Sequence, residues 1–124
     1  MGEIVQETQH RVIFGDSRIM KEVDKKSVQL MVTSPPYPMI DMWDDHFRKL
    51  DKRIDNLWRQ MENEEDRDKR EDTVSEIYNL MHENLAQVWK EAYRVLIDGG
   101  IACINIGDAT RNINGTFRLF PNHV

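Results

Sequence analysis

Three short apolar runs along the chain are separated by longer segments in which apolar residues recur at helical spacing. The runs lie at residues 11–17, 28–32 and 101–106, and each leads into a polar turn. Short apolar runs bounded by turn residues are typical of buried strands, and strands that alternate with helices favour a parallel sheet. The pattern therefore predicts an α/β fold with a strand at each run.

Two helices are predicted from the spacing of apolar residues between the strands. Ser17 is a candidate cap for a short helix at residues 18–23. Residues 46–61 carry apolar side chains three or four positions apart, which is one face of an amphipathic helix.

A third and longer helix is predicted at residues 77–96, where the helical periodicity is strongest. Thr73 and Glu76 have the spacing of a capping box, which predicts the start of this helix. Gly99 and Gly100 suit the left-handed backbone of a helix end, and they predict where it stops.

Two segments are predicted to have little regular structure of their own. Residues 62–72 hold seven acidic and three basic side chains and no apolar one, which favours a solvated helix end or a linker. The chain from residue 111 is expected to be a polar loop, with the start of another element near Phe117. We therefore predict one domain over residues 1–124, with a charged helical insert at residues 45–75.

Composition and charge narrow the class of protein. The chain has 124 residues, of which 40% are hydrophobic and 31% charged, as in a soluble globular domain. No apolar run approaches the roughly 18 residues of a membrane span. The single cysteine, Cys103, excludes an internal disulfide and favours a reducing cytoplasm. The formal net charge of −5 provides no global attraction for nucleic acid, so any basic DNA-binding surface must be local or supplied by another part.

The second apolar run ends in a proline-rich loop, Thr-Ser-Pro-Pro-Tyr-Pro at residues 33–38. Prolines cannot continue a strand ladder, because each lacks an N–H and fixes φ. The loop is therefore expected at the carboxyl end of a strand, where ligands bind in open α/β sheets. An exposed polyproline ligand for an aromatic groove is the other interpretation of these residues, and the preceding buried strand disfavours it.

The motif Ser-Pro-Pro-Tyr at residues 34–37 resembles the catalytic motif of DNA amino-methyltransferases. Residues 14–17 look like the strand end of that family that carries an acidic residue near the cofactor, and residues 95–111 look like its next helix-to-strand passage. The resemblance implies an α/β fold, namely part of a Rossmann-like, mostly parallel methyltransferase sheet with a helical insert. It also implies a site-specific enzyme of the restriction–modification type.

By this resemblance the loop is the catalytic element and S-adenosylmethionine is the methyl donor. Ser34 and the Pro35 carbonyl would accept hydrogen bonds from the exocyclic amine of a flipped base, and Tyr37 would stack on that base. Asp16 would accept from the adenine amine of the cofactor. The implied catalytic residues are Ser34, Pro35, Pro36 and Tyr37. The implied cofactor-binding residues are Phe14, Gly15, Asp16, Ser17, Thr33, Asn105, Gly107 and Asp108, and no metal is implied.

The glycine-rich cofactor loop of this family, Phe-x-Gly-x-Gly after a strand, does not occur in these 124 residues. In the permuted class that loop follows the catalytic motif. The resemblance therefore implies an N-terminal portion whose cofactor pocket is completed by a C-terminal part or by a second chain, with double-stranded DNA as partner. Serine at position 34 resembles N4-cytosine enzymes more than N6-adenine enzymes. An adenine enzyme, an inactive binding remnant, and an enzyme acting on RNA or a small molecule remain alternatives.

Several further side chains have two interpretations. Three acidic residues and a histidine lie close together at a predicted helix start. This spacing suits helix capping better than a metal site. The residues are Asp41, Asp44, Asp45 and His46. Arg111 and Arg118 are candidate phosphate contacts or solvated loop residues. The remaining expectations are a flexible lip over the base at Met39, Ile40 and Trp43, core positions for Trp58 and Trp89, and surface positions for His82 and His123.

Overall fold

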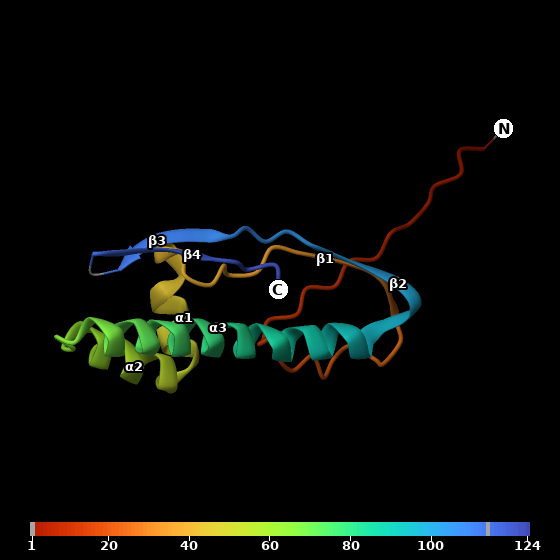
Figure 1. Ribbon diagram of the computed structural model, residues 1–124. Helices are drawn as coiled ribbons and strands as arrows, with labels where there is room; N and C mark the ends of the chain where they lie inside the picture. The colour runs from red at the N-terminus through yellow and green to blue at the C-terminus, as the bar shows by residue number, and fades with distance from the viewer. Residues whose placement is uncertain (1, 114) are drawn as a thin grey trace.

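The computed structural model describes residues 2–113 and 115–124 as a small α/β structure (Figure 1). Its elements in chain order are β1 (Val28–Thr33), η1 (Asp41–Trp43), α1 (Asp44–Leu50), α2 (Lys52–Glu62), α3 (Arg67–Val95), β2 (Leu96–Ile104), β3 (Ala109–Ile113) and β4 (Thr116–Phe120). In Figure 1 the long helix α3 runs below the strands, and the chain turns back at its end so that β2 returns above it. None of the helices in the described ranges is long and apolar enough to cross a membrane.

The predicted parallel pairing is confirmed for β1 and β2. Leu30 pairs with Ile101 and Thr33 pairs with Ile104, so both strands end at the same edge. The register shifts between Val28 and Leu30, opposite the two glycines of β2. The expectation of a buried strand is wrong for the described chain, since Val32 is 72% exposed.

Gly99 and Gly100 do not end the long helix, as the sequence predicted, because α3 already stops at Val95. They lie inside β2, where Gly99 has φ +77°. A Cβ on Gly100 would lie 3.0 Å from the Ile97 carbonyl oxygen and 3.2 Å from that of Gln29. The glycines therefore allow the irregularity in the strand pair, a role that glycine fills as readily as a helix end.

The predictions of a strand at residues 11–17 and a helix at residues 18–23 are wrong. Within the described ranges no strand pairs with residues 11–17, and an unpaired strand is not stable. Residues 18–23 form turns through single bonds, from Ile19 N to Asp16 O at 3.0 Å and from Val23 N to Met20 O at 3.1 Å. The carbonyl oxygens of Met20 and Val23 accept instead from the Arg94 side chain on α3.

The single helix predicted at residues 46–61 is two helices, α1 and α2, separated at Asp51. Asp51 has extended backbone angles and its carboxylate accepts from Arg53 N at 3.0 Å, which caps α2. Hydrogen bonds from the Arg53 side chain, and then from Asn84, lower the pKa of Asp51 to about 2. The apolar spacing continues across the break, so periodicity alone could not reveal it.

Helix α3 begins at Arg67, seven residues or so before the start that the capping-box spacing predicted. Its cap is Asp66, whose carboxylate accepts from the backbone N–H groups of Asp68 and Lys69. Thr73 lies inside the helix, and its hydroxyl donates to Lys69 O at 2.9 Å. Much of the charged segment at residues 62–72 is therefore helix rather than linker.

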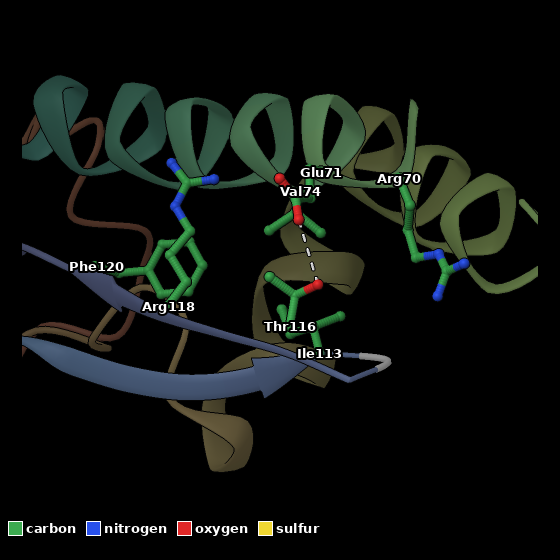
Figure 2. A pocket seen from close by; sticks show the side chains of 7 residues that line it. All are labelled: Arg70, Glu71, Val74, Ile113, Thr116, Arg118 and Phe120. Carbon is green, nitrogen blue, oxygen red and sulfur yellow. Dashed lines mark hydrogen bonds between the residues drawn. The ribbon is translucent and has the colours of Figure 1, made fainter. Parts of the chain in front are cut away.

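The polar loop expected from residue 111 is largely an antiparallel hairpin of β3 and β4. Side chains of the hairpin and of α3 face each other (Figure 2), with Thr116 Oγ1 donating to Glu71 Oε1 at 3.3 Å and Arg118 Nη1 donating to Ser75 Oγ at 2.7 Å. Only about 20 Å³ of open space remains between them. The packed core joins the hairpin to the helices through Met39, Phe47, Ile54, Trp58, Met61, Val74, Ile77, Met81, Ala109 and Phe120. The core position predicted for Trp58 is thus confirmed, whereas Trp89 is half-buried.

Candidate active site

The proline-rich loop begins where β1 ends, at the shared edge of the parallel pair. Thr33 O accepts from Asn105 N at 2.9 Å, which holds the start of the loop beside the end of β2. Ser34 is exposed and Pro35 is buried, so the loop is anchored by its first proline while the serine faces solvent. Ser34 Oγ and Tyr37 Oη lie 3.4 Å apart and share a hydrogen bond. Two hydroxyl groups therefore converge at this edge.

The end of the loop is held by the core rather than forming a flexible lip. Met39 has φ +64°, a left-handed backbone that non-glycine residues rarely adopt, and its side chain is 1% exposed. Ile40 and Trp43 pack, partly buried, against the same core. The left-handed turn directs the Met39 side chain into the interior. The sequence did not indicate this turn, because glycine or asparagine is the usual residue at such a backbone angle.

The loop after β2 meets the proline-rich loop at Tyr37. A Cβ on Gly107 would lie 3.3 Å from Tyr37 Cε2, so a side chain at this position would press on the ring. The structure thus brings together Thr33, Tyr37, Asn105 and Gly107, all candidates from the sequence. This follows from the parallel pairing, because the carboxyl ends of β1 and β2 lie side by side.

Asp108, the next candidate, is engaged by the end of the chain. Its Oδ1 accepts from Asn122 N at 2.8 Å and pairs with His123 Nδ1 at 2.8 Å. The hydrogen bond from the Asn122 backbone N–H, and after it the bond from His123, lower the pKa of Asp108. His123 is exposed, as expected, but it has an acidic partner that the sequence did not reveal.

Asn122 is a residue that sequence reasoning missed. It is 3% exposed, and its side-chain Nδ2 donates to Pro38 O at 2.8 Å and to Gly107 O at 3.0 Å. Its Oδ1 lies 3.1 Å from His82 Nε2. His82 is half-buried rather than on the surface, and burial lowers its pKa. A polar residue after an apolar strand carries no periodic signal, so only tertiary structure reveals it.

Residues 15–17 contribute to an open cavity of about 420 Å³ that also reaches the proline-rich loop. Its lining includes Gly15, Asp16 and Ser17, with Pro36 from the loop and Asn84 from α3. Phe14 does not line it and is 94% exposed. The cavity therefore joins three of the four upstream candidates to the proline motif.

Asp16 is held as an ionised acceptor on the rim of this cavity. Arg18 donates to both of its carboxylate oxygens, with Nη2 to Oδ2 at 2.7 Å, and these bonds lower the pKa of Asp16. Arg18 is fixed in turn by Asn84 Oδ1 at 2.8 Å. Oδ1 also accepts from the Arg18 backbone N–H at 2.9 Å, and Oδ2 from Arg18 Nε at 2.9 Å, so a ligand amine would replace one of the Arg18 contacts.

The two arginines considered as phosphate contacts have structural partners. Arg111 lies in β3, its side chain is 15% exposed, and it pairs with Asp44 at 2.6 Å and Asp41 at 3.0 Å. Burial raises the pKa of Asp44, and Arg111 opposes that shift. Arg118 donates to α3 and stacks over Phe120. The described residues contain no group of three or more His, Cys, Asp or Glu side chains that could hold a metal ion.

The sequence matches the family described as DNA methylase, which comprises N6 and N4 methyltransferases, over residues 28–122. The chain belongs to this family, as the resemblance of its motifs implied. The chain is 63% identical over 116 residues to the Type II methyltransferase M.MjaI of Methanocaldococcus jannaschii, and 48% identical over 117 residues to the Type II methyltransferase M.MthZI of Methanothermobacter thermautotrophicus.

Both matches cover 94% of this chain but only 38% and 30% of the respective relatives. The chain thus spans roughly a third of the length of the curated methyltransferases it matches. No solved structure matches it.

Proposed function

We propose that this chain forms the catalytic-motif part of an S-adenosylmethionine-dependent DNA methyltransferase that modifies an exocyclic amine. The observation that carries the proposal is the convergence of Ser34 Oγ and Tyr37 Oη, 3.4 Å apart, at the carboxyl end of β1. Gly107 lies against the Tyr37 ring and leaves it free of any side chain there. Membership of the DNA methylase family supports the same reaction.

Ser34 and Pro35 supply acceptors for the target amine. The lone pair of an exocyclic amine is delocalised into the base, so the amine is a poor nucleophile. Hydrogen bonds donated by the amine to Ser34 Oγ and the Pro35 carbonyl favour a pyramidal nitrogen whose lone pair is available. The prolines fix these acceptors in advance, which reduces the entropy lost on binding.

Tyr37 offers a face on which a flipped base can stack. Flipping costs a few kcal/mol of stacking and pairing energy. Stacking on an aromatic side chain returns about 1–3 kcal/mol per base, so Tyr37 offsets a large part of that cost. Its ring is half-buried, which limits the positions that the base can take.

The cavity beside the loop fits S-adenosylmethionine. Gly15, Asp16 and Ser17 line it together with Pro36, and the ionised Asp16 carboxylate suits an adenine amine. Thr33, Asn105, Gly107 and Asp108 are proposed to line the adjoining edge. When bound, the cofactor supplies an electrophilic methyl group: the amine nitrogen forms the new N–C bond and sheds a proton while the C–S electron pair stays on sulfur.

Cytosine N4 is the proposed target. The family uses serine, aspartate or asparagine at the position of Ser34, and serine there resembles the N4-cytosine enzymes more than the N6-adenine enzymes. Adenine N6 is the second candidate. Double-stranded DNA is the proposed substrate, in a cytoplasmic restriction–modification setting. The longer relatives support a further part, in the same or a second chain, that carries the glycine-rich loop of the cofactor pocket.

The test uses a chimera in which this chain replaces the matching segment of M.MjaI. We expect transfer of labelled methyl groups from S-adenosylmethionine to unmethylated plasmid DNA, and N4-methylcytosine in the nucleoside digest. Ser34→Ala and Tyr37→Ala should each slow the transfer by about 100-fold or more. The matched controls are Ser27→Ala, just before β1 and at its opposite end, and Tyr93→Ala, which is 86% exposed.

Full activity of the double variant Ser34→Ala/Tyr37→Ala would contradict the assigned roles. N6-methyladenine in the digest would change the target base only. A folded chimera that binds S-adenosylmethionine without transferring methyl groups would favour a binding remnant.

A further inference from the structure

A buried amide lies behind the catalytic loop, and the reaction proposed above does not use it. Asn122 donates from the same nitrogen to Pro38 O at 2.8 Å and to Gly107 O at 3.0 Å. Pro38 directly follows Tyr37, and Gly107 lies against the Tyr37 ring. One side chain therefore ties together the two segments that meet at the stacking residue.

Asn122 is itself fixed in place by α3. Because both N–H bonds of its amide are used on carbonyl oxygens, its Oδ1 is the acceptor, and His82 Nε2 donates to it at 3.1 Å. The His82 ring packs edge-on against Tyr78, with centroids 4.7 Å apart. Tyr78 Oη donates to the carbonyl of Pro121, the residue before Asn122. Two hydrogen bonds from α3 thus fix this part of the chain: His82 holds the Asn122 amide, and Tyr78 holds the preceding residue.

The bond to Pro38 acts on a strained peptide. The Pro38 carbonyl and the Met39 N–H belong to one peptide unit, and Met39 has φ +64°. A non-glycine residue keeps such an angle only where its surroundings determine it. Asn122 Nδ2 fixes the orientation of this peptide from one side, while burial of the Met39 side chain fixes it from the other.

We propose that Asn122, held by His82, is a positioning residue for methyl transfer: its amide fixes Pro38 and Gly107 and thereby sets the Tyr37 ring against the target base. This inference rests on the proposed function. Asn122 acts through Tyr37 and contacts neither the base nor the cofactor.

The test uses the same chimera with unmethylated plasmid DNA and labelled S-adenosylmethionine. Asn122→Asp keeps the size of the side chain and removes both donated bonds. We expect kcat, expressed per site that binds S-adenosylmethionine at equilibrium, to fall about 10–100-fold, because small misplacements of reacting groups have effects of that order. The KM for S-adenosylmethionine should rise much less than kcat falls, since the main cavity does not include Asn122, and Gly107, which it holds, is proposed to line only the adjoining edge. Asn56→Asp makes the same chemical change on the exposed side of α2 and should leave kcat unchanged.

A double-mutant cycle separates positioning from general loss of structure. If Asn122 acts through Tyr37, Asn122→Asp should have little further effect on the residual activity of Tyr37→Ala, because that variant has no ring to position. Equal losses of kcat in the wild-type and Tyr37→Ala backgrounds would overturn the proposal.

Should Asn122→Asp fail to fold, two variants of His82 provide the decision. His82→Gln keeps a side-chain N–H donor, whereas His82→Phe keeps a ring against Tyr78 and has no donor. We expect His82→Gln to retain kcat and His82→Phe to lose it; equal kcat in both would overturn the inference. A wild-type chimera without methyl transfer would contradict the proposed function itself, and an active wild type with an equally active Asn122→Asp would contradict only this inference.

Discussion

The helix–hairpin core, formed by α1, α2, α3 and the β3–β4 hairpin, differs sharply from the strand pair of β1 and β2. In the core, Ile77 and Met81 are fully buried and Phe120 is 1% exposed. In the strand pair no residue is buried, and Val32 and Ile101 are 72% and 61% exposed. The helix–hairpin core has its own packed interior, whereas the strands that lead into the proline-rich loop are held mainly by each other.

This difference shows that the proline motif follows a strand with little tertiary support, while the later part of its loop is held by the core. The apolar side chains of β1 and β2 have the composition of a buried parallel sheet. The matching relatives are considerably longer than this chain. We therefore expect the remainder of such a protein to cover the strand pair, and the helix–hairpin core to need no such cover.

The largest expected difference comes from making the same truncation in both regions. Ile77→Ala should lower the free energy of unfolding by about 2–5 kcal/mol, because it opens a cavity in a closed core. Ile101→Ala should cost under about 1 kcal/mol, since the side chain is already largely in water. Urea denaturation of each variant measures both. Equal costs would show that the two regions are not distinct in this way.

Ion pairs give the next comparison. Arg111 and Asp44 are 15% and 16% exposed in the core, while Lys26 and Asp98 are 52% and 88% exposed beside the strand pair. Arg111→Ala should cost about 2–3 kcal/mol, because it leaves the Asp44 carboxylate largely buried and unpaired. Lys26→Ala should change the free energy of unfolding by less than about 0.5 kcal/mol. Thermal and urea unfolding should show a larger loss of stability for Arg111→Ala than for Lys26→Ala. A larger loss for Lys26→Ala would contradict the comparison.

Acid should weaken the core through Asp51. Its folded pKa of about 2 lies below the ordinary value of 3.8, so the ionised form stabilises the fold above about pH 4. This contribution should be lost as the pH falls from about 4 to 2, and we expect about 1 kcal/mol after allowing for the half-exposed Arg53.

Urea midpoints measured across that pH range would test this for Asp51→Asn. Asp98→Asn removes the same charge from a side chain that is 88% exposed, and the difference between the two variants isolates the contribution of Asp51. The prediction would be contradicted if the urea midpoint of Asp51→Asn fell between pH 4 and pH 2 as steeply as that of the wild type.

A small effect on stability is also expected where the two regions meet. Gly107→Ala places a Cβ 3.3 Å from the Tyr37 ring, so the ring must shift by a few tenths of an ångström. The free energy of unfolding should change by under about 1 kcal/mol. The chimera should nevertheless lose about tenfold in kcat, because the stacking face has moved. Gly2→Ala, where a Cβ meets nothing within 4 Å, is the matched control.

Sequence predicted the parts of the fold that depend on local chemistry. The strand before the proline motif, its parallel partner and the meeting of their ends all follow from apolar runs that stop at turn residues. The prediction that Thr73 caps the long helix is wrong, because a capping-box spacing can also occur inside a helix. The residue that caps α3 is Asp66, which is an equally suitable residue type for a cap. Gly99 and Gly100 likewise suit two different conformations.

The unpredicted features depend on contacts between distant residues. Asn122 acquires its role from Pro38 and Gly107, which are 84 and 15 positions away. The hairpin was missed because β4 owes its stability to packing on α3 rather than to a run of apolar residues. The sequence leaves Arg111 as a phosphate contact or a solvated residue, because its buried partner, Asp44, lies 67 positions earlier.

The register of the strand pair also determines the order in which the chain can fold. Leu30 pairs with Ile101, 71 positions away, whereas each residue of the hairpin pairs within a dozen positions. Closing so long a loop is costly until the intervening helices have formed and shortened it. We therefore expect the proline-rich loop to acquire its shape last. On heating it should be the first part to be lost, so the proposed methyl transfer should fail at temperatures at which the helices persist.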